Sequence, residues 1–259
     1  MRWDDPSVDW SSFGAAWIRS TWDYTGRSDE FLTWTARVAA LTRLWNPAEV
    51  VAWNSHKSYL LELAAAGVAV VPTEPVAAGT AVDLVALMDD RGWDEVVVKP
   101  AVGAGDVGAE RVPRSRARAW TEADRARTAP DRLVQPLVVE VADGEVSLLV
   151  VEGRLTHAVR KVPAPGDFRV HAHLGGRELA HEPTPAERDL ARAVLAVDAL
   201  ADGPLASGGE PLLYARVDCV TTAQGPQLME LELIEPSLFL PLAPPDARRT
   251  LADSVVARL

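Results

Sequence analysis

Short apolar runs bounded by turn residues predict β-strands along much of the chain. The clearest pair covers residues 145–151 and 154–162, which the turn Glu152-Gly153 joins into a predicted hairpin. Single strands are predicted over residues 15–18, 68–71, 95–100 and 132–137. Because helical patterns lie between these runs, the chain is expected to form a mixed fold of helices and sheets.

Helical spacing of apolar residues predicts the elements between the strands. Asn54 and Ser55 are expected to cap a helix that Gly67 ends, with Lys57 in its first turn. Thr184 is expected to cap a helix running to about Leu200, and another helix is predicted over residues 81–88. Two further helices are predicted to bury one face each, formed by Phe31, Trp34, Val38 and Leu41 and by Leu251, Val255 and Leu259.

A second hairpin carries a concentration of charge. Two alternating runs flank the turn Gln224-Gly225-Pro226, and a symmetric fold about Gln224 sets Asp218 opposite Glu230 and Arg216 opposite Glu232. Opposed carboxylates repel unless a cation lies between them, and hard carboxylate oxygens suit Mg²⁺. The alternative is a solvated outer face of an ordinary hairpin. The apolar exit over residues 234–240 favours a central strand.

Lysine is rare in this chain, and its positions are informative. Only three of the 26 basic residues are lysines: Lys57, Lys99 and Lys161. The predicted strand 95–100 leads Lys99 directly into the glycine-rich loop 101–108, whose backbone N–H groups could close on phosphate oxygens. The order of residues differs from a Walker A loop, which places the lysine after the glycines. The alternative for the loop is an ordinary glycine-rich turn without a ligand. The alternative for the three lysines is that their positions are due to chance.

Composition limits the kinds of partner. The 259 residues are 48% hydrophobic with a net charge of -11, which allows a full core and argues against a nucleic-acid partner. No apolar stretch reaches the roughly 18 residues of a membrane span, so a cytoplasmic protein without a membrane partner is expected. The single cysteine, Cys219, is expected to pack in a strand. Seven of the nine tryptophans precede residue 54, which suggests a first subdomain ending near residue 53.

Taken in chain order, six motifs resemble one enzyme family. They are Lys57, Val98-Lys99-Pro100, Gln135-Pro136-Leu137, Gly166-Asp167-Phe168-Arg169, Val217-Asp218 and Met229-Glu230-Leu231-Glu232. This series resembles the ATP-grasp ligases of the bacterial glutathione synthetase and ribosomal-protein-modifying kind. The nearest branch is the cycloserine-forming O-ureido-serine cyclo-ligases, which the chain resembles over residues 19–24, 53–57 and 235–240.

The resemblance implies an α+β (α/β) ATP-grasp fold whose two subdomains clasp the nucleotide. It divides the chain into an N-terminal pre-ATP-grasp domain over residues 1–54, a central subdomain with a glycine-rich lid over 55–136, and a C-terminal subdomain with the acidic hairpin over 137–259. Family members begin with another strand and helix before Trp3, so either the start of the chain is truncated or the first domain is reduced.

The resemblance also implies roles for individual residues. Those expected to bind ATP are Lys57, Lys99, Gly103, Gly105, Gly108, Gln135, Leu137 and Glu145. Asp218, Glu230 and Glu232 are expected to hold two Mg²⁺ ions, with Mn²⁺ as an alternative. Lys161, Arg169 and Arg216 are expected to be catalytic, the first two by stabilising the transferring phosphoryl group. Glu232 stands where glutathione synthetases carry an asparagine.

The implied reaction is phosphorylation of a small-molecule carboxylate to an acyl phosphate, followed by attack of an amine or similar nucleophile. Two other activities share the ATP-binding residues and stay open: a small-molecule kinase and a nucleotide-binding module without ligase activity. Dependence on substrates separates them, because only a ligase needs both a carboxylate and a nucleophile. Whether the protein forms a homodimer is also open, and the sequence does not name the substrate.

Overall fold

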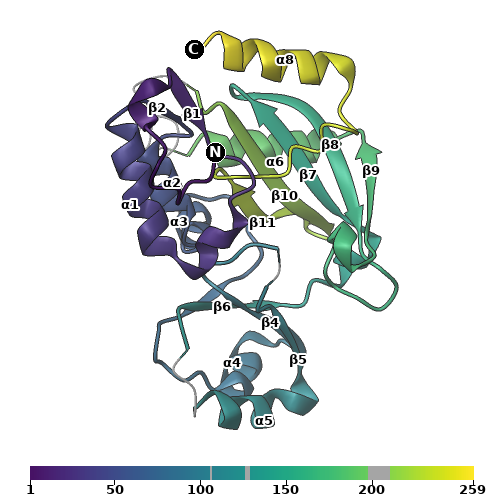
Figure 1. The fold of residues 1–259 in the computed structure, drawn as a ribbon. Coiled ribbons are helices and arrows are strands. Elements are labelled where there is room, and N and C mark those ends of the chain that lie inside the picture. The colour runs from purple at the N-terminus through teal and green to yellow at the C-terminus, as the bar shows by residue number, and fades with distance from the viewer. Residues whose placement is uncertain (106, 126–128, 198–210) are drawn as a thin grey trace.

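Three β-sheets organise the computed structural model, which describes residues 1–105, 107–125, 129–197 and 211–259 (Figure 1). The largest is a five-stranded antiparallel sheet in the order β11-β10-β7-β8-β9. Its strands are β7 (Glu145–Val151), β8 (Arg154–Val162), β9 (Arg177–His181), β10 (Tyr214–Thr222) and β11 (Gly225–Glu232). Long apolar runs in β7 and β10 are fully buried, because helices and the N-terminal region cover this sheet.

The lower lobe in Figure 1 is built on a four-stranded antiparallel sheet in the order β3-β6-β4-β5. Helices α4 (Leu84–Arg91) and α5 (Arg114–Asp124) pack on it through Met88, Val96 and Trp120. Asp83 caps α4 through two backbone N–H groups, and Gly92 ends it with φ +68°. The strands are β3 (Glu74–Val76), β4 (Glu95–Pro100), β5 (Glu110–Pro113) and β6 (Arg132–Pro136).

The N-terminal region has its own aromatic core. Trp3, Trp10, Phe31 and Trp34 are buried there, and the rings of Trp10 and Trp34 meet edge to face at 5.3 Å. A parallel pair of strands, β1 and β2, lies beside it. The elements are η1 (Trp10–Ser12), β1 (Ala15–Trp17), η2 (Trp22–Gly26), α1 (Ser28–Ala39), β2 (Arg43–Trp45), α2 (Ala48–Asn54) and α3 (Tyr59–Ala65).

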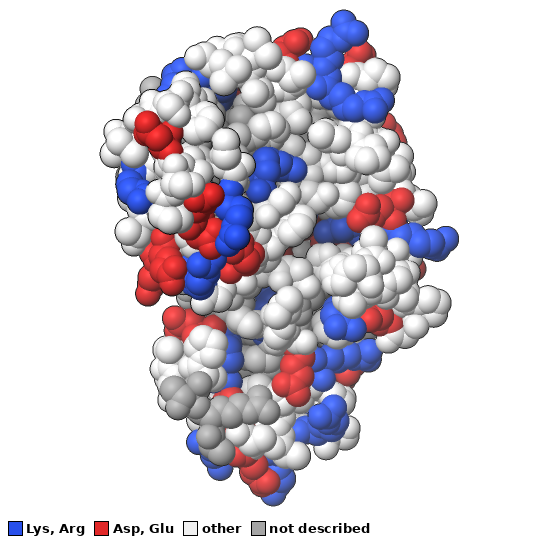
Figure 2. All heavy atoms as spheres, viewed as in Figure 1, with Lys and Arg blue, Asp and Glu red and all other residues white. Residues whose placement is uncertain are grey.

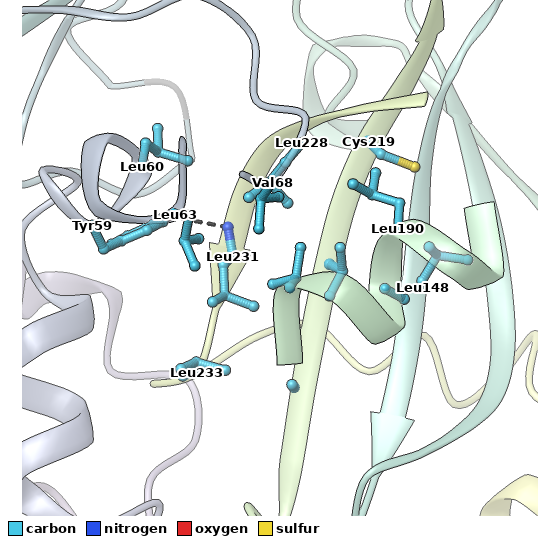
Figure 3. Close-up of a cluster of buried hydrophobic side chains, with 14 of the residues drawn as sticks. Tyr59, Leu60, Leu63, Val68, Leu148, Leu190, Cys219, Leu228, Leu231 and Leu233 are labelled. Atoms are coloured by element: carbon cyan, nitrogen blue, oxygen red, sulfur yellow. Dashed lines mark hydrogen bonds between the residues drawn. The ribbon is translucent and has the colours of Figure 1, made fainter. Parts of the chain in front are cut away.

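The core between α3, α6 (Pro185–Leu195) and the large sheet joins distant parts of the chain (Figure 3). Leu60 and Leu63 of α3 pack there with Leu190 of α6 and with Leu228 and Leu231 of β11. The helix α8 (Pro245–Val256) packs against β7 and β8, and the 3₁₀ turns η3 (Val139–Asp143) and η4 (Ala172–Leu174) connect strands. Among the described residues, no helix is long and apolar enough to cross a membrane.

Several predicted elements are confirmed. The strands over 95–100 and 132–136 form, the 145–162 hairpin has its predicted bounds, and Cys219 is buried in β10. Thr184 and Glu187 form the expected reciprocal capping box of α6. That helix is described to Leu195, and the expected end near Leu200 lies outside the described residues.

Other predictions are wrong, and helix ends account for most of them. Asn54 and Ser55 end α2 rather than begin α3, so Lys57 lies in the link between two helices. Residues 68–71 form only an isolated bridge from Val70 to Leu228. Leu41 and Leu259 lie just beyond the ends of their helices and are therefore exposed, instead of lying on the buried faces.

The acidic strand β11 is an edge strand, although the apolar segment after it predicted a central one. Its outer side is nevertheless covered. Asn54 accepts from the N–H of Leu233 and donates to the carbonyl of Leu231, both at 2.8 Å, and the Tyr59 hydroxyl accepts from the N–H of Leu231 at 3.1 Å. Side chains of the helical region thus satisfy the backbone groups that a neighbouring strand would otherwise pair.

Candidate active site

A cavity of about 420 Å³ lies where the two lobes meet. Its walls come from η2, the α2–α3 link, β4 with its glycine-rich loop, β7, β8, β10, β11 and the segment after β11. Positive and negative side chains are interspersed over the face shown in Figure 2. The lining includes most of the residues that the sequence singled out: Lys57, Lys99, Gly103, Gly105, Glu145, Lys161, Arg216, Asp218, Glu230 and Glu232.

The register of the hairpin β10–β11 brings its charged residues together. Asp218 pairs with Glu230 and Arg216 pairs with Glu232, as the symmetric fold predicted. The pairing register shifts between Asp218 and Cys219, so the predicted symmetric pairing holds for Arg216 and Asp218 but not for the residues from Cys219 onward. The solvated outer face is therefore excluded, because Arg216 and Asp218 are buried and all four side chains line the cavity.

Asp218 is the most enclosed of the carboxylates. It accepts from the Ser147 hydroxyl at 2.6 Å, from Arg216 at 2.8 Å and from the Lys161 ammonium at 3.2 Å. Burial alone would raise the pKa of Asp218, but Arg216 and Lys161 outweigh it and hold that pKa well below its usual range. Asp218 is therefore a fixed negative charge at the floor of the cavity.

Lys161 and Arg216 bridge this carboxylate to its neighbours. Lys161 also pairs with Glu145 at 2.6 Å, and Arg216 also pairs with Glu232 and donates to the Ser237 carbonyl at 3.3 Å. Burial opposes the charge of each cation, yet the surrounding carboxylates raise the pKa of both above the usual values. Both side chains therefore keep their positive charge although they are buried.

Lys57 and Glu230 form the second charged pair. The Lys57 ammonium lies 2.8 Å from a Glu230 oxygen and donates to the Gly103 carbonyl at 2.6 Å. Its backbone N–H donates to the carbonyl of Ala101 at 2.8 Å, so Lys57 is tied twice to the glycine-rich loop. Burial opposes ionisation of Glu230, but Lys57 and Lys99 lower its pKa below the usual range.

Two other acids on this wall have raised pKa values. Burial is the main cause for Glu232, and with the charges of Asp218 and Glu230 it raises the pKa to about 7 despite Arg216. Burial, aided by Glu232, raises the pKa of Glu235 to about 8. The cavity therefore contains acids that are ionised and acids that can hold a proton near neutral pH.

The glycine-rich loop follows Lys99 at the end of β4. Gly105 and Gly108 have φ of +65° and +81°, and a Cβ on Gly108 would lie 2.9 Å from Cγ of Pro100. Both backbone conformation and space therefore require glycine at Gly108. Asp106 of this loop lies outside the described residues.

A smaller cavity of about 60 Å³ adjoins the large one and shares Lys99 and Glu145 with it. Gln135 lies here and donates to the Thr73 hydroxyl at 2.8 Å. Leu137 also lies here, but its backbone N–H donates to the Glu95 carbonyl at 2.9 Å and is already used. The remaining lining is mostly apolar, with Val97, Pro136, Val138, Val141, Phe168, Val170 and Met229.

Of the predicted site residues, Gly108 and Arg169 are not among the described residues that line either cavity, and Arg169 lies in the segment between β8 and η4. Its guanidinium pairs with Asp167 at 2.9 Å, and its own backbone N–H donates to the same carboxylate. The neighbouring Phe168 and Val170, in contrast, line the cavities.

Sequence reasoning missed part of the lining. Trp22, Tyr24 and Thr25 of η2 reach the cavity, as does Glu235. Three of these residues fall in the segments 19–24 and 235–240 that carry the family resemblance, but no site role was predicted for them. A charged residue within an apolar exit segment was the available signal for Glu235. His171 and His173 at the η4 turn, whose rings stack at 5.5 Å, also line the cavity.

Comparisons with known proteins agree with this architecture. Residues 1–46 match the family described as D-cycloserine synthetase DcsG, N-terminal domain, and residues 69–208 match the prokaryotic glutathione synthetase, ATP-grasp domain. The cycloserine biosynthesis protein DcsG of Streptomyces lavendulae is 35% identical over 267 residues, which cover 99% of this chain and 87% of that protein.

A probable alpha-L-glutamate ligase of Xanthomonas campestris is 33% identical over 131 residues, covering 51% of this chain and 40% of that protein. This chain thus matches less than half the length of that relative. The crystal structure of D-cycloserine synthetase DcsG superposes with a TM-score of 0.85 at 33% identity, covering 99% of this chain and 87% of that one.

Proposed function

This chain belongs to the ATP-grasp ligases, and on that premise we propose that its cavity activates the carboxylate of a small amino-acid-like substrate through an acyl phosphate. The chain is an ATP-dependent ligase that acts on small molecules. The observation that carries the proposal is the convergence of Lys57, Lys99 and Lys161 with the three hairpin carboxylates on one cavity.

Phosphate binding is assigned to the cations beside the glycine-rich loop. Lys57 and Lys99 would meet the phosphate oxygens, and the loop with Gly103, Gly105 and Gly108 would close over them. Lys161 and Arg216 would neutralise charge on the transferring phosphoryl group, since both stay charged in a buried setting. Arg169 would take the same role as a third cation, with Asp167 holding its guanidinium at 2.9 Å.

Magnesium is assigned to Asp218, Glu230 and Glu232. In the described part of the structure no three His, Cys, Asp or Glu side chains are already grouped as metal ligands, because these carboxylates pair with Lys57, Lys161 and Arg216. The donor set still fits the ion: the oxygens are hard, and the hairpin register holds them on adjacent strands. The ion would screen the phosphate charge and orient its oxygens.

The apolar smaller cavity is assigned to adenine. Gln135 would contact the base, together with backbone near Leu137 other than its N–H, and Glu145 would contact the ribose. The three-part division at residues 54 and 136 belongs to the same proposal. The homodimer and the cytoplasmic location expected from the sequence remain predictions.

The chemistry follows from this placement. A carboxylate oxygen of the substrate attacks the γ-phosphorus of ATP, the bond from that phosphorus to the bridging oxygen breaks, and ADP leaves. The nucleophile then attacks the acyl carbon, loses a proton, and inorganic phosphate leaves. Positioning and charge neutralisation are sufficient for both steps, so no covalent protein nucleophile is needed.

Calorimetric titration with a non-hydrolysable ATP analogue, with and without Mg²⁺, tests the nucleotide site. Magnesium-dependent binding in the micromolar range is expected, and absence of binding contradicts the proposal. ADP release then separates the activities. A ligase requires both a carboxylate and a nucleophile, a kinase requires one substrate, and a module that only binds nucleotide responds to neither.

A further inference from the structure

Glu235 differs from the three hairpin carboxylates in that no lysine or arginine of the described residues forms an ion pair with it, and Lys57 and Arg216 act on it only at longer range. Its side chain is 7% exposed and lines the cavity. Asp218, Glu230 and Glu232 each meet a lysine or arginine, whereas within the described residues Glu235 is hydrogen-bonded only to its own backbone. A buried acid without an ion-pair partner tends to hold its proton, and a cationic ligand would favour its ionised form, so Glu235 at the cavity wall is suited to bind a cation.

The backbone around Glu235 is held firmly in place. The Ile234 carbonyl accepts from the Tyr214 hydroxyl at 2.6 Å, and the Pro236 carbonyl accepts from Arg19 at 2.7 Å. Arg19 is thus directed to the Pro236 carbonyl rather than to the Glu235 carboxylate. The carboxylate therefore occupies a preorganised position, which reduces the entropy cost of binding a ligand there.

The position of Glu235 relative to the phosphoryl-transfer residues suggests what the ligand is. Glu235 follows Glu232 by three residues, so their Cα atoms lie at most about 10 Å apart. An α-amino acid whose carboxylate faces the Arg216 and Glu232 region carries its ammonium group one carbon away. Glu235 lines the same cavity and lies on the segment that directly follows β11, so it is placed to meet that group.

We propose that Glu235 is the specificity-determining residue that binds the α-ammonium group of an amino-acid substrate. This inference rests on the proposed ligase function, because that function supplies the carboxylate to be activated beside it. A charged hydrogen bond in a buried site favours the amino compound strongly over an analogue without the amino group. Glu235 is not assigned to the metal, which the hairpin carboxylates would hold.

The test compares O-ureido-serine with 3-(ureidooxy)propionate, which lacks only the α-amino group. Each is titrated by calorimetry into the full chain in the presence of Mg²⁺ and a non-hydrolysable ATP analogue. The unaltered chain is expected to bind the amino compound at least tenfold more tightly. In Glu235→Gln the two affinities are expected to become nearly equal. Glu235→Asp is expected to keep part of the preference for the amino compound. The control Glu182→Gln, at an exposed position, is expected to bind both compounds as the unaltered chain does.

Retention of the tenfold preference in Glu235→Gln would overturn the inference, as would equal or absent binding of the two compounds by the unaltered chain. A weaker nucleotide affinity or a higher Mg²⁺ requirement in Glu235→Gln, with the preference unchanged, would place Glu235 with the metal and overturn it as well. The nucleotide titration reports separately on the ligase proposal. If the chain discriminates between the compounds but does not bind nucleotide, the proposed function fails, and a preference for the amino compound that Glu235→Gln abolishes shows an ammonium site of another function.

Discussion

At the scale of single residues, the cations of the cavity differ in how they are held. Lys57 and Lys161 are buried and each meets a carboxylate, while Lys99 is half-buried at the end of β4 and lines both cavities. Lys99 borders both proposed parts of the nucleotide site. Of the three lysines, its removal should therefore reduce turnover most and destabilise the fold least.

Lys99→Ala is therefore expected to reduce ATP-dependent ADP release about 100-fold or more, because an electrostatic contact to the transferring group is lost. The thermal midpoint should change by less than about 2 °C, since this side chain is not in a core cluster. Arg111→Ala on the neighbouring strand is the control and should keep full turnover. Unchanged turnover in Lys99→Ala would refute the phosphate assignment.

Glu230→Gln removes a charge but keeps the shape of the side chain. The Mg²⁺ concentration for half-maximal activity is expected to rise about tenfold or more, because a neutral amide is a weaker ligand for a hard cation. The measurement is ADP release across a Mg²⁺ titration. An unaltered titration curve would count against the metal site, and Glu182→Gln provides the baseline.

At the scale of elements, β11 depends on side chains from outside its own sheet. At the end of α2, the Asn54 side chain hydrogen-bonds to the backbone of Leu231 and Leu233 on the outer side of this strand. Asn54→Ala is expected to lower the free energy of unfolding by about 2–4 kcal/mol, because a buried donor and a buried acceptor lose their partner. Urea denaturation measures this, and a loss below about 0.5 kcal/mol would mean that water replaces the amide.

The cap of α6 gives a pH-dependent prediction. Glu187 accepts from His181 and from the Thr184 N–H, and although burial opposes ionisation, these contacts lower its pKa below the usual 4.5. A depressed folded-state pKa stabilises the protein above pH 4.5, and that contribution is lost as pH falls further. Glu187→Gln should therefore be less stable at pH 7, with the difference shrinking below pH 4.5 in thermal melts.

Elements that are specified by neighbouring residues, such as caps and turns, could be predicted from the sequence. Features that depend on contacts between distant parts of the chain could not. The capping box and the hairpins carry their own turn and cap residues, so Thr184 and the Asp218–Glu230 pairing could be read from the sequence. The role of Asn54 could not, because its amide bonds to a strand 177 residues away. Glu235 likewise becomes informative only when the fold shows it buried at the cavity wall without an ion pair to any described lysine or arginine.

At the scale of the whole molecule, ligand binding should stabilise the fold as a unit. A nucleotide at 100 times its Kd adds about 2.7 kcal/mol to the free energy of unfolding. For a chain of this size that corresponds to roughly 5–10 °C in the thermal midpoint. Differential scanning fluorimetry with the ATP analogue and Mg²⁺ should show this shift, and Lys99→Ala should lose most of it.

The bonds from Asn54 and Tyr59 to β11 also bear on how this enzyme can be engineered. Near Glu230 and Glu232, the outer hydrogen bonds of this segment come from the end of α2 and the start of α3, so the proposed domain boundary at residue 54 divides parts that support each other. Exchanging the first region for that of another ligase would remove a structural support of the acidic hairpin. Residues 69–71 also bond to Leu228 of β11, so chimeras that keep residues 46–71 with the C-terminal part should retain nucleotide binding better than those cut at residue 54.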